Sequence, residues 1–160
     1  KVILEPYEKW TNEKMEKKVM IAYVSMWGST EKMVKALNEE LVKRNIPVNV
    51  FDLPVTDIGH VAKELIDTPV IVVGGPTVLN LIHPSAAYAT LLVKQLRAPT
   101  KYVALLTSHG WSGGAVKFVS SLIEGMKVEV LDIIDVKGPP KQAEFDRITQ
   151  LADKIAEKLA

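Results

Sequence analysis

The sequence of 160 residues contains no cysteine. This absence excludes disulfide bonds, thiolate nucleophiles and cysteine-ligated zinc or iron–sulfur sites. The only histidines are His60, His83 and His109, and no histidine–carboxylate cluster has metal-ligand spacing, so we expect no metal site. A chain without cysteine also fits the cytoplasm, which is the location we expect.

Neither sign of charge is in excess, since 20 basic and 19 acidic residues leave a formal net charge of +1. Such a balance provides no strong field for binding nucleic acid or an anionic membrane. No apolar run is long enough to cross a bilayer, and no signal peptide opens the chain. We therefore expect neither nucleic acid nor a membrane among the partners.

Hydrophobic residues make up 48% of the chain, a composition typical of one globular domain. From residue 18 onward, short apolar runs alternate with amphipathic stretches. The pattern predicts strands at 18–24, 47–53, 69–74, 101–107 and 126–136, and helices at 29–44, 57–66, 85–96, 115–123 and 142–159. This alternation predicts one α/β domain over 18–160, a three-layer sandwich of a five-stranded parallel sheet with helices on both faces.

Residues 1–17 precede the first expected strand and carry Tyr7 and Trp10. We expect a linker there that ends in a short helix. The chain starts at Lys1 rather than at a methionine, which indicates processing or an excerpt from a longer protein.

In open parallel sheets, ligands bind beyond the carboxyl ends of the strands, where the strand order reverses. The loop after the first expected strand, 25–30, contains three hydroxyl side chains and one glycine and leads into a helix. Free N–H groups at a helix N-terminus favour an anion, so this loop predicts a phosphate site that needs no lysine or arginine. An ordinary Ser/Thr helix cap is the alternative.

The loop after the third expected strand, 74–84, starts with Gly74, Gly75 and Pro76. Residues without a side chain let the backbone approach a ligand closely. Apolar residues from Val78 onward suggest a wall against a flat ligand, with Thr77 and Asn80 as hydrogen-bonding groups. The alternative is a loop that packs on a neighbouring helix or partner.

The loop after the fourth expected strand, 107–114, places three glycines around Trp111. An exposed aromatic side chain there is a stacking platform, and the alternative is a tryptophan that plugs the core. A phosphate site, a polar edge and an aromatic wall together fit a flavin with a ribityl phosphate.

Three motifs, at 25–33, at 75–77 with Asn80 and Pro84, and at 110–115, resemble the flavodoxin-like domain of flavodiiron proteins, the A-type flavoproteins. The resemblance covers residues 18–159. It implies the flavodoxin-like strand order 2-1-3-4-5, FMN as cofactor, and an electron-transfer domain without catalytic residues of its own. The segment with Ile3, Tyr7 and Trp10 is similar to the linker that joins this domain to an upstream diiron domain.

In that family, FMN relays electrons to a diiron domain that reduces oxygen or nitric oxide, and no diiron ligands occur in this chain. The resemblance further implies a rubredoxin-like or flavin-reductase electron donor, and it allows a homodimer of the full-length protein. The implied FMN contacts are Ser25, Met26, Trp27, Gly28, Ser29, Thr30, Pro76, Thr77, Val78, Leu79, Asn80, Ser108, His109, Gly110, Trp111, Ser112, Gly113 and Gly114. The chain departs from the family pattern at Val24, Leu79 and His109, where relatives often carry Asp, Asn and Tyr.

Other classes share parts of this pattern. Residues 110–114 match the G-x-S-x-G elbow of α/β-hydrolases, but no histidine follows Ser112 to act as its base. A phosphorelay receiver needs acids where this chain has Ser25 and Gly74. Two alternatives stay open: a stand-alone flavin-dependent NAD(P)H:quinone reductase, and a flavin-free assembly module.

Overall fold

The computed structural model describes residues 16–160, so the expected linker at 1–17 lies almost wholly outside the described residues. The strands are β1 (Val19–Tyr23), β2 (Val48–Asp52), β3 (Val70–Val78), β4 (Leu81–Ile82), β5 (Tyr102–His109) and β6 (Glu129–Lys137). The helices are α2 (Ser29–Lys43), α3 (Ile58–Glu64), α4 (Pro84–Gln95), α5 (Ala115–Ile123) and α6 (Gln142–Leu159).

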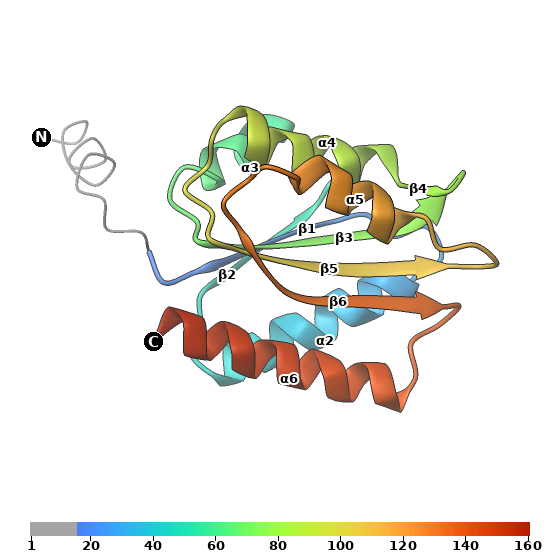
Figure 1. The fold of residues 1–160 in the computed structure, drawn as a ribbon. Helices are drawn as coiled ribbons and strands as arrows, with labels where there is room; N and C mark the ends of the chain where they lie inside the picture. The colour runs from blue at the N-terminus through green and yellow to red at the C-terminus, as the bar shows by residue number, and fades with distance from the viewer. Residues whose placement is uncertain (1–15) are drawn as a thin grey trace, which may run out of the picture.

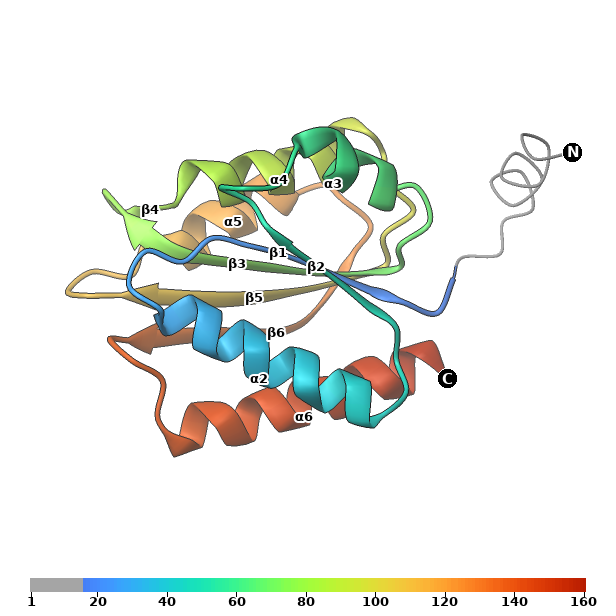
Figure 2. The same cartoon turned by 180° about the vertical axis from the view of Figure 1, so that it is seen from behind.

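The main sheet has the order β2-β1-β3-β5-β6, and all of its neighbouring strands are parallel. This is the predicted order, with β5 and β6 as the fourth and fifth strands of the prediction. Helices α2 and α6 cover one face, and α3, α4 and α5 cover the other (Figures 1 and 2). The predicted flavodoxin-like three-layer sandwich is therefore confirmed.

Alternation along the strands divides the core between the two faces. In β1, Val19 and Ile21 face α2 and α6, while Met20 and Ala22 face α3 and α4. All four side chains are fully buried. The central strands therefore bury apolar side chains on both faces, as parallel strands between two helical layers do.

The prediction missed one hairpin. Strand β3 continues beyond the predicted end at Gly74 and turns back as the short antiparallel strand β4. Two residues, Leu79 and Asn80, form the turn with φ of 49° and 63°. Two-residue hairpins of this kind usually contain glycine, and neither glycine nor an Asn-Gly pair marks this turn in the sequence.

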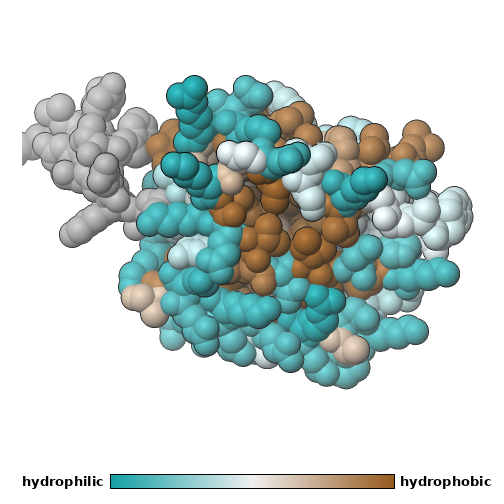
Figure 3. Space-filling model, in the orientation of Figure 1, coloured by the Kyte–Doolittle hydropathy of each residue, from teal (hydrophilic) through white to brown (hydrophobic). Residues whose placement is uncertain are grey.

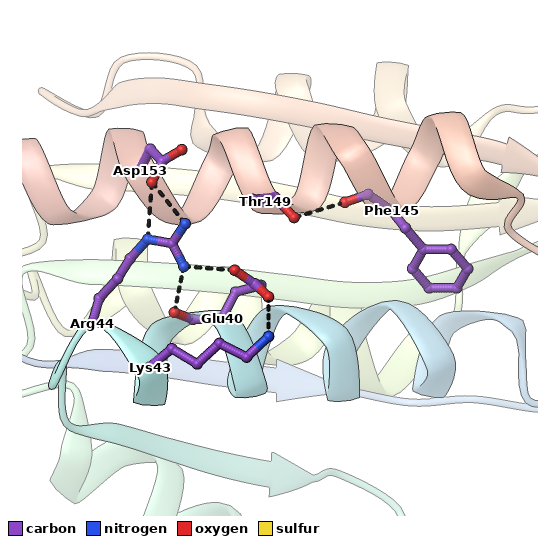
Figure 4. A network of polar contacts seen from close by, with 6 residues as sticks. All are labelled: Glu40, Lys43, Arg44, Phe145, Thr149 and Asp153. Atoms are coloured by element: carbon purple, nitrogen blue, oxygen red, sulfur yellow. Dashed lines mark hydrogen bonds and ion pairs between the residues drawn. The ribbon is translucent and has the colours of Figure 1, made fainter.

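Polar contacts connect α2 to α6 on the outer side of their layer (Figure 4). The guanidinium of Arg44 donates to Asp153 Oδ1 from two nitrogens, at 2.9 and 2.7 Å, and to Glu40 Oε2 at 2.7 Å. The first contact joins the C-terminus of α2 to the last turns of α6. Because these groups lie at the surface, their contribution to stability is modest.

Figure 3 shows apolar side chains gathered near the middle of one face of the molecule, over α5 and β6.

Strand β6 is one edge of the sheet. Side chains form hydrogen bonds with backbone N–H and C=O groups along the open side of this strand. Arg147 donates to the carbonyl of Ile133 at 2.8 Å, and Asp132 Oδ1 accepts from the N–H of Ile133 at 2.7 Å. An edge whose backbone groups are paired locally resists pairing with another chain.

Within residues 16–160, none of the helices combines the length and the apolar character needed to cross a bilayer.

Candidate ligand-binding site

A cavity of about 770 Å³ opens at the carboxyl ends of β3 and β5 and at the start of α2. This volume lies within the range of about 300–1,000 Å³ that is usual for small-molecule sites. In Figure 1 the strand arrowheads point toward this end of the sheet, where β4 and the loop after β5 extend. The cavity therefore lies where the parallel-sheet rule predicts a ligand.

The N-terminus of α2 forms one end of the cavity. Gly28, at the N-cap position, has a φ of 83°, and α2 has no side-chain cap from that residue. The hydroxyl of Ser25 accepts hydrogen bonds from the N–H groups of Gly28 at 3.1 Å and Glu31 at 3.3 Å. The Ser25 hydroxyl thus caps the Glu31 N–H, as the helix-cap alternative expects, and the N–H groups of Ser29 and Thr30, which have no partner inside the helix, are the donors left for a phosphate.

Hydroxyl groups continue from this end into the cavity. Thr30 is 1% exposed, and its Oγ1 lies 3.3 Å from Ser108 Oγ, which joins the start of α2 to the end of β5. Among the described residues, nothing bonds to the buried hydroxyls of Thr77 and Thr107. Buried polar atoms are almost always paired, so the unpaired hydroxyl of Thr77, a residue that lines the cavity, is an exception at this site.

The second and third predicted loops pack directly against each other. The hydroxyl of Ser112 donates to Asn80 Oδ1 at 2.6 Å. A Cβ on Gly114 would lie 1.9 Å from the carbonyl oxygen of Asn80, so only glycine allows this approach. The turn after β3 and the loop after β5 therefore form one continuous wall.

Large apolar side chains stand at the surface around the cavity. Trp27 is 90% exposed, Leu79 92% and Trp111 94%, and all three line the cavity. The exposure of Trp111 rules out the alternative in which this side chain plugs the core. Side chains of this size left in water at a cavity rim are available for contact with a flat ligand.

Most of the residues that the sequence singles out meet at this cavity. Of the implied FMN contacts, Gly28, Gly113 and Gly114 do not line it and instead shape the loops around it. Three residues that the sequence does not predict also line the cavity, namely Lys32, Gly138 and Pro139. Lys32 lies inside the first motif, in the first turn of α2 and two residues beyond the 25–30 loop, whereas the loop after β6 carries no motif.

The prediction that Gly74 and Gly75 let the backbone approach a ligand is wrong. Gly74 and Gly75 lie inside β3 and do not line the cavity. A Cβ on Gly74 would lie 2.8 Å from Tyr23 Cβ, and one on Gly75 would lie 3.0 Å from Ile82 Cγ1, so these glycines make room for core packing. The close approach there is between strand and core, not between backbone and ligand.

The side chains that line the cavity are neutral or basic, and the nearby carboxylate of Asp135 lies 3.0 Å from His109 Nδ1 without lining the cavity. The lining residues that the structure describes include Lys32 and no carboxylate. Lys32 adds a cation to the lining from beyond the 25–30 loop, which itself contains no lysine or arginine. Of the two loop histidines, His109 lines the cavity, while His83 caps α4 by accepting from the N–H of Ser85 at 3.3 Å.

These groups fit FMN. The phosphate matches the α2 N-terminus with Ser25, Ser29 and Thr30, the unpaired hydroxyl of Thr77 provides a polar partner, and the two tryptophans provide apolar surface for a ring. A lining without carboxylates also suits an anionic cofactor. The described residues contain no cluster of histidines and acids that could hold a metal ion.

The fold and this site define a flavodoxin-like protein, and the sequence profile of the flavodoxin family matches residues 21–150. The chain belongs to the flavodoxin family, whose cofactor is FMN and whose function is electron transfer. Within that family, the chain is homologous to the flavodoxin-like domain of flavodiiron proteins.

Three relatives support this assignment. The chain is 34% identical to a nitric oxide reductase of Moorella thermoacetica, over 99% of this chain and 40% of the relative. The solved rubredoxin oxygen:oxidoreductase of Desulfovibrio gigas superposes with a TM-score of 0.88 at 30% identity, over 98% of this chain and 39% of that one. The flavodiiron protein of Giardia intestinalis superposes with a TM-score of 0.83 at 25% identity, over 99% of this chain and 42% of that one. The chain spans about two fifths of the length of these relatives.

Proposed function

We propose that this chain binds FMN in the cavity at the carboxyl ends of β3 and β5 and relays electrons to a diiron domain that reduces oxygen or nitric oxide. The observation that carries the proposal is the unpaired, buried hydroxyl of Thr77 in a cavity that also contains the α2 N-terminus. Bound FMN supplies the redox chemistry. The protein binds the phosphate, orients the ring and limits access of water.

The residues proposed to hold FMN divide into three groups. Ser25 through Thr30 surround the phosphate, with Lys32 as a nearby positive charge. Pro76 through Asn80 contact one side of the ring, and Ser108 through Gly114 enclose the other. Because Ser112 bridges to Asn80, the two ring-contacting loops are held relative to each other before a ligand arrives.

Similarity to longer relatives supports the relay. One relative is named a nitric oxide reductase and another a rubredoxin oxygen:oxidoreductase. We infer a rubredoxin-like or flavin-reductase electron donor, and a homodimer in the full-length protein. We place residues 1–17 as a linker to an upstream diiron domain and 18–160 as the FMN domain, in the cytoplasm.

A pair of Thr→Val variants tests the cofactor site. Thr30→Val removes a buried hydroxyl at the cavity, whereas Thr149→Val removes an exposed hydroxyl on α6 that bonds only within its own helix (Figure 4). Loss of one hydrogen bond to a charged ligand group is worth about 1.5–3 kcal/mol, so we expect FMN binding about tenfold weaker or more in Thr30→Val. Thr149→Val should bind as the wild type, and circular dichroism should show both variants folded.

The relay is tested with the FMN-loaded chain after photoreduction under argon. We expect rapid reoxidation by a one-electron acceptor and no steady oxidation of NAD(P)H with a quinone. Sustained NAD(P)H:quinone turnover would instead identify a stand-alone reductase. A purified chain that takes up no flavin would instead favour the alternative of a flavin-free assembly module.

A further inference from the structure

His109 and Asp135 form a polar pair beside the cavity. His109 ends β5, and Asp135 lies in β6 directly opposite Thr107 in the parallel register. Residues two positions apart in a strand share a face, so His109 and Asp135 lie diagonally on the same face of the sheet. The His109 Nδ1 and Asp135 Oδ1 atoms are 3.0 Å apart, and the two side chains are 17% and 26% exposed.

The glycine-rich loop closes over this pair. A Cβ on Gly113 would lie 2.8 Å from Asp135 Oδ2 and 3.1 Å from His109 Nδ1. The bare backbone at Gly113 therefore packs directly against both side chains. Partial removal of water strengthens a hydrogen bond to a charged group, which favours a fixed arrangement of the pair.

The chemistry of the pair determines which ring nitrogen carries hydrogen. An ionised carboxylate only accepts, so Asp135 requires a hydrogen on Nδ1 of His109. In the neutral ring, Nε2 then holds a lone pair and acts as an acceptor. His109 lines the cavity and Asp135 does not, so Nδ1 is occupied by the partner on β6 and Nε2 is the nitrogen left for a ligand.

Other charged groups near the pair do not compete for Nδ1. Lys137 is the register partner of His109 on β6, and Lys32 lines the same cavity from α2. Both are cations, which offer hydrogen-bond donors only. Asp135 is thus the group that sets the orientation of the His109 ring.

We propose that Asp135 is a positioning residue for the flavin site: it holds His109 in the Nδ1–H form, so that Nε2 accepts a hydrogen bond from an N–H or O–H group of bound FMN. This inference rests on the proposed FMN site. It adds a residue of β6 that no motif of the three loops contains. It also gives a function to Gly113, which shapes the pair without lining the cavity.

The first test is the tautomer of His109 in the ligand-free chain, read from nitrogen-15 shifts of the imidazole ring at mildly alkaline pH. Only three histidines are present, and a His109→Gln variant assigns the signal. We expect the Nδ1–H pattern in the wild type and a shift toward the Nε2–H pattern in Asp135→Ala. His60 and His83 serve as internal references and should not change.

The second test is the FMN dissociation constant of the same variants. A lost hydrogen bond of about 1.4 kcal/mol corresponds to a tenfold change, so Asp135→Ala should bind FMN about tenfold more weakly. Asp135→Asn keeps an acceptor oxygen and should bind more tightly than the alanine variant. Asp146→Ala removes a surface carboxylate of α6 that bonds to Gln142, and should bind as the wild type.

The outcomes separate this inference from the proposed function. A wild type that binds no FMN contradicts the proposed function, while the tautomer of the ligand-free chain still reports on the pair. A wild type that binds FMN, with tautomer and affinity unchanged in Asp135→Ala, overturns the role of Asp135 alone. Equal weakening in the alanine and asparagine variants would assign the effect to charge and overturn the hydrogen-bond role.

Discussion

The hydroxyl of Ser112 donates a hydrogen bond to Asn80 across 32 positions of the chain, at 2.6 Å. This contact joins the loop after β5 to the β3–β4 turn beside the cavity. The carbonyl of Asn80 lies against Gly114 in the same region, which leaves no room for a side chain there. The shape of the site therefore depends on two loops that are far apart in sequence and in direct contact in the fold.

Two glycine substitutions test this contact. Gly114→Ala would bring a Cβ to 1.9 Å from the Asn80 carbonyl oxygen, a backbone atom that cannot rotate away. We expect a loss of about 1–3 kcal/mol in the free energy of unfolding and much weaker FMN binding. Gly110→Ala is the matched control for stability, because a Cβ there meets nothing within 4 Å in the ligand-free chain. Equal free energies of unfolding of the two variants in urea would contradict the loop contact.

The β3–β4 turn carries a residue in an unfavourable conformation. Leu79 has a φ of 49° and a side chain that is 92% exposed, so little packing offsets the steric cost of about 1–2 kcal/mol. Asparagine tolerates this region better, and we expect Leu79→Asn to raise the free energy of unfolding of the ligand-free chain by about 1 kcal/mol.

The control for this variant is Leu81→Asn, in β4 beyond the turn, where the side chain is 45% exposed. A polar residue in a strand has no conformational gain there, so stability should fall or stay unchanged. Urea midpoints for both variants provide the comparison. A midpoint for Leu79→Asn no higher than that of the wild type would argue against strain at Leu79.

The sequence predicts the main sheet well, because its parallel strands are buried on both faces and appear as apolar runs. The hairpin is not predicted because Leu79 and Asn80 adopt positive φ without glycine, and Pro76 interrupts the strand pattern. Most of the cavity residues follow from the position of three loops after strand ends.

Asp135 and Lys32 are not predicted as site residues for a different reason. Asp135 meets His109 only through the register of β5 and β6, and this register contains a bulge between Val103 and Ala104. An extra residue in one strand changes which side chains share a face, and the sequence pattern does not specify it. Lys32 lies on α2 beyond the loop, where a lysine is an ordinary surface residue.

The hydrogen bonds of Asp132 predict a pH dependence of stability. Burial raises the pKa of Asp132, but hydrogen bonds from Arg147, the Ile133 N–H and Lys154 together lower it by more than burial raises it. The pKa of Asp132 therefore lies below its usual range. We expect Asp132→Asn to reduce the free energy of unfolding at neutral pH by about 1–2 kcal/mol. The effect should be modest because Arg147 is partly exposed.

The sign of the pH effect follows from the lowered pKa. The contribution of ionised Asp132 to the free energy of unfolding is complete above its pKa in the unfolded chain, about 3.9. This contribution is lost as the pH falls through the lower pKa of the folded chain. Wild type and Asp132→Asn should therefore converge in strong acid, measured by urea unfolding from neutral to acidic pH. Asp146→Asn, on the surface of α6, should keep a constant small difference. A gap between wild type and Asp132→Asn that is unchanged in strong acid would exclude this role of Asp132.

The lining of the cavity predicts the redox behaviour of bound FMN. Nearby carboxylates disfavour the negatively charged reduced cofactor, and the described lining contains none, while Lys32 adds a positive charge. We expect a less negative reduction potential than in flavodoxins with acidic loops around the flavin. Lys32→Glu should lower the potential. Potentiometric titration measures both, and a wild-type midpoint as low as in strongly reducing flavodoxins would contradict the argument.

The most direct test of the FMN site is a titration of the flavin-free chain with FMN, with riboflavin as the matched ligand that lacks the phosphate. Charge-assisted hydrogen bonds are worth about 1.5–3 kcal/mol each, so two at the α2 N-terminus correspond to an affinity difference of about a hundredfold or more. We predict one FMN per chain and at least that preference over riboflavin. No binding of FMN, or equal affinity for the two flavins, would contradict the account.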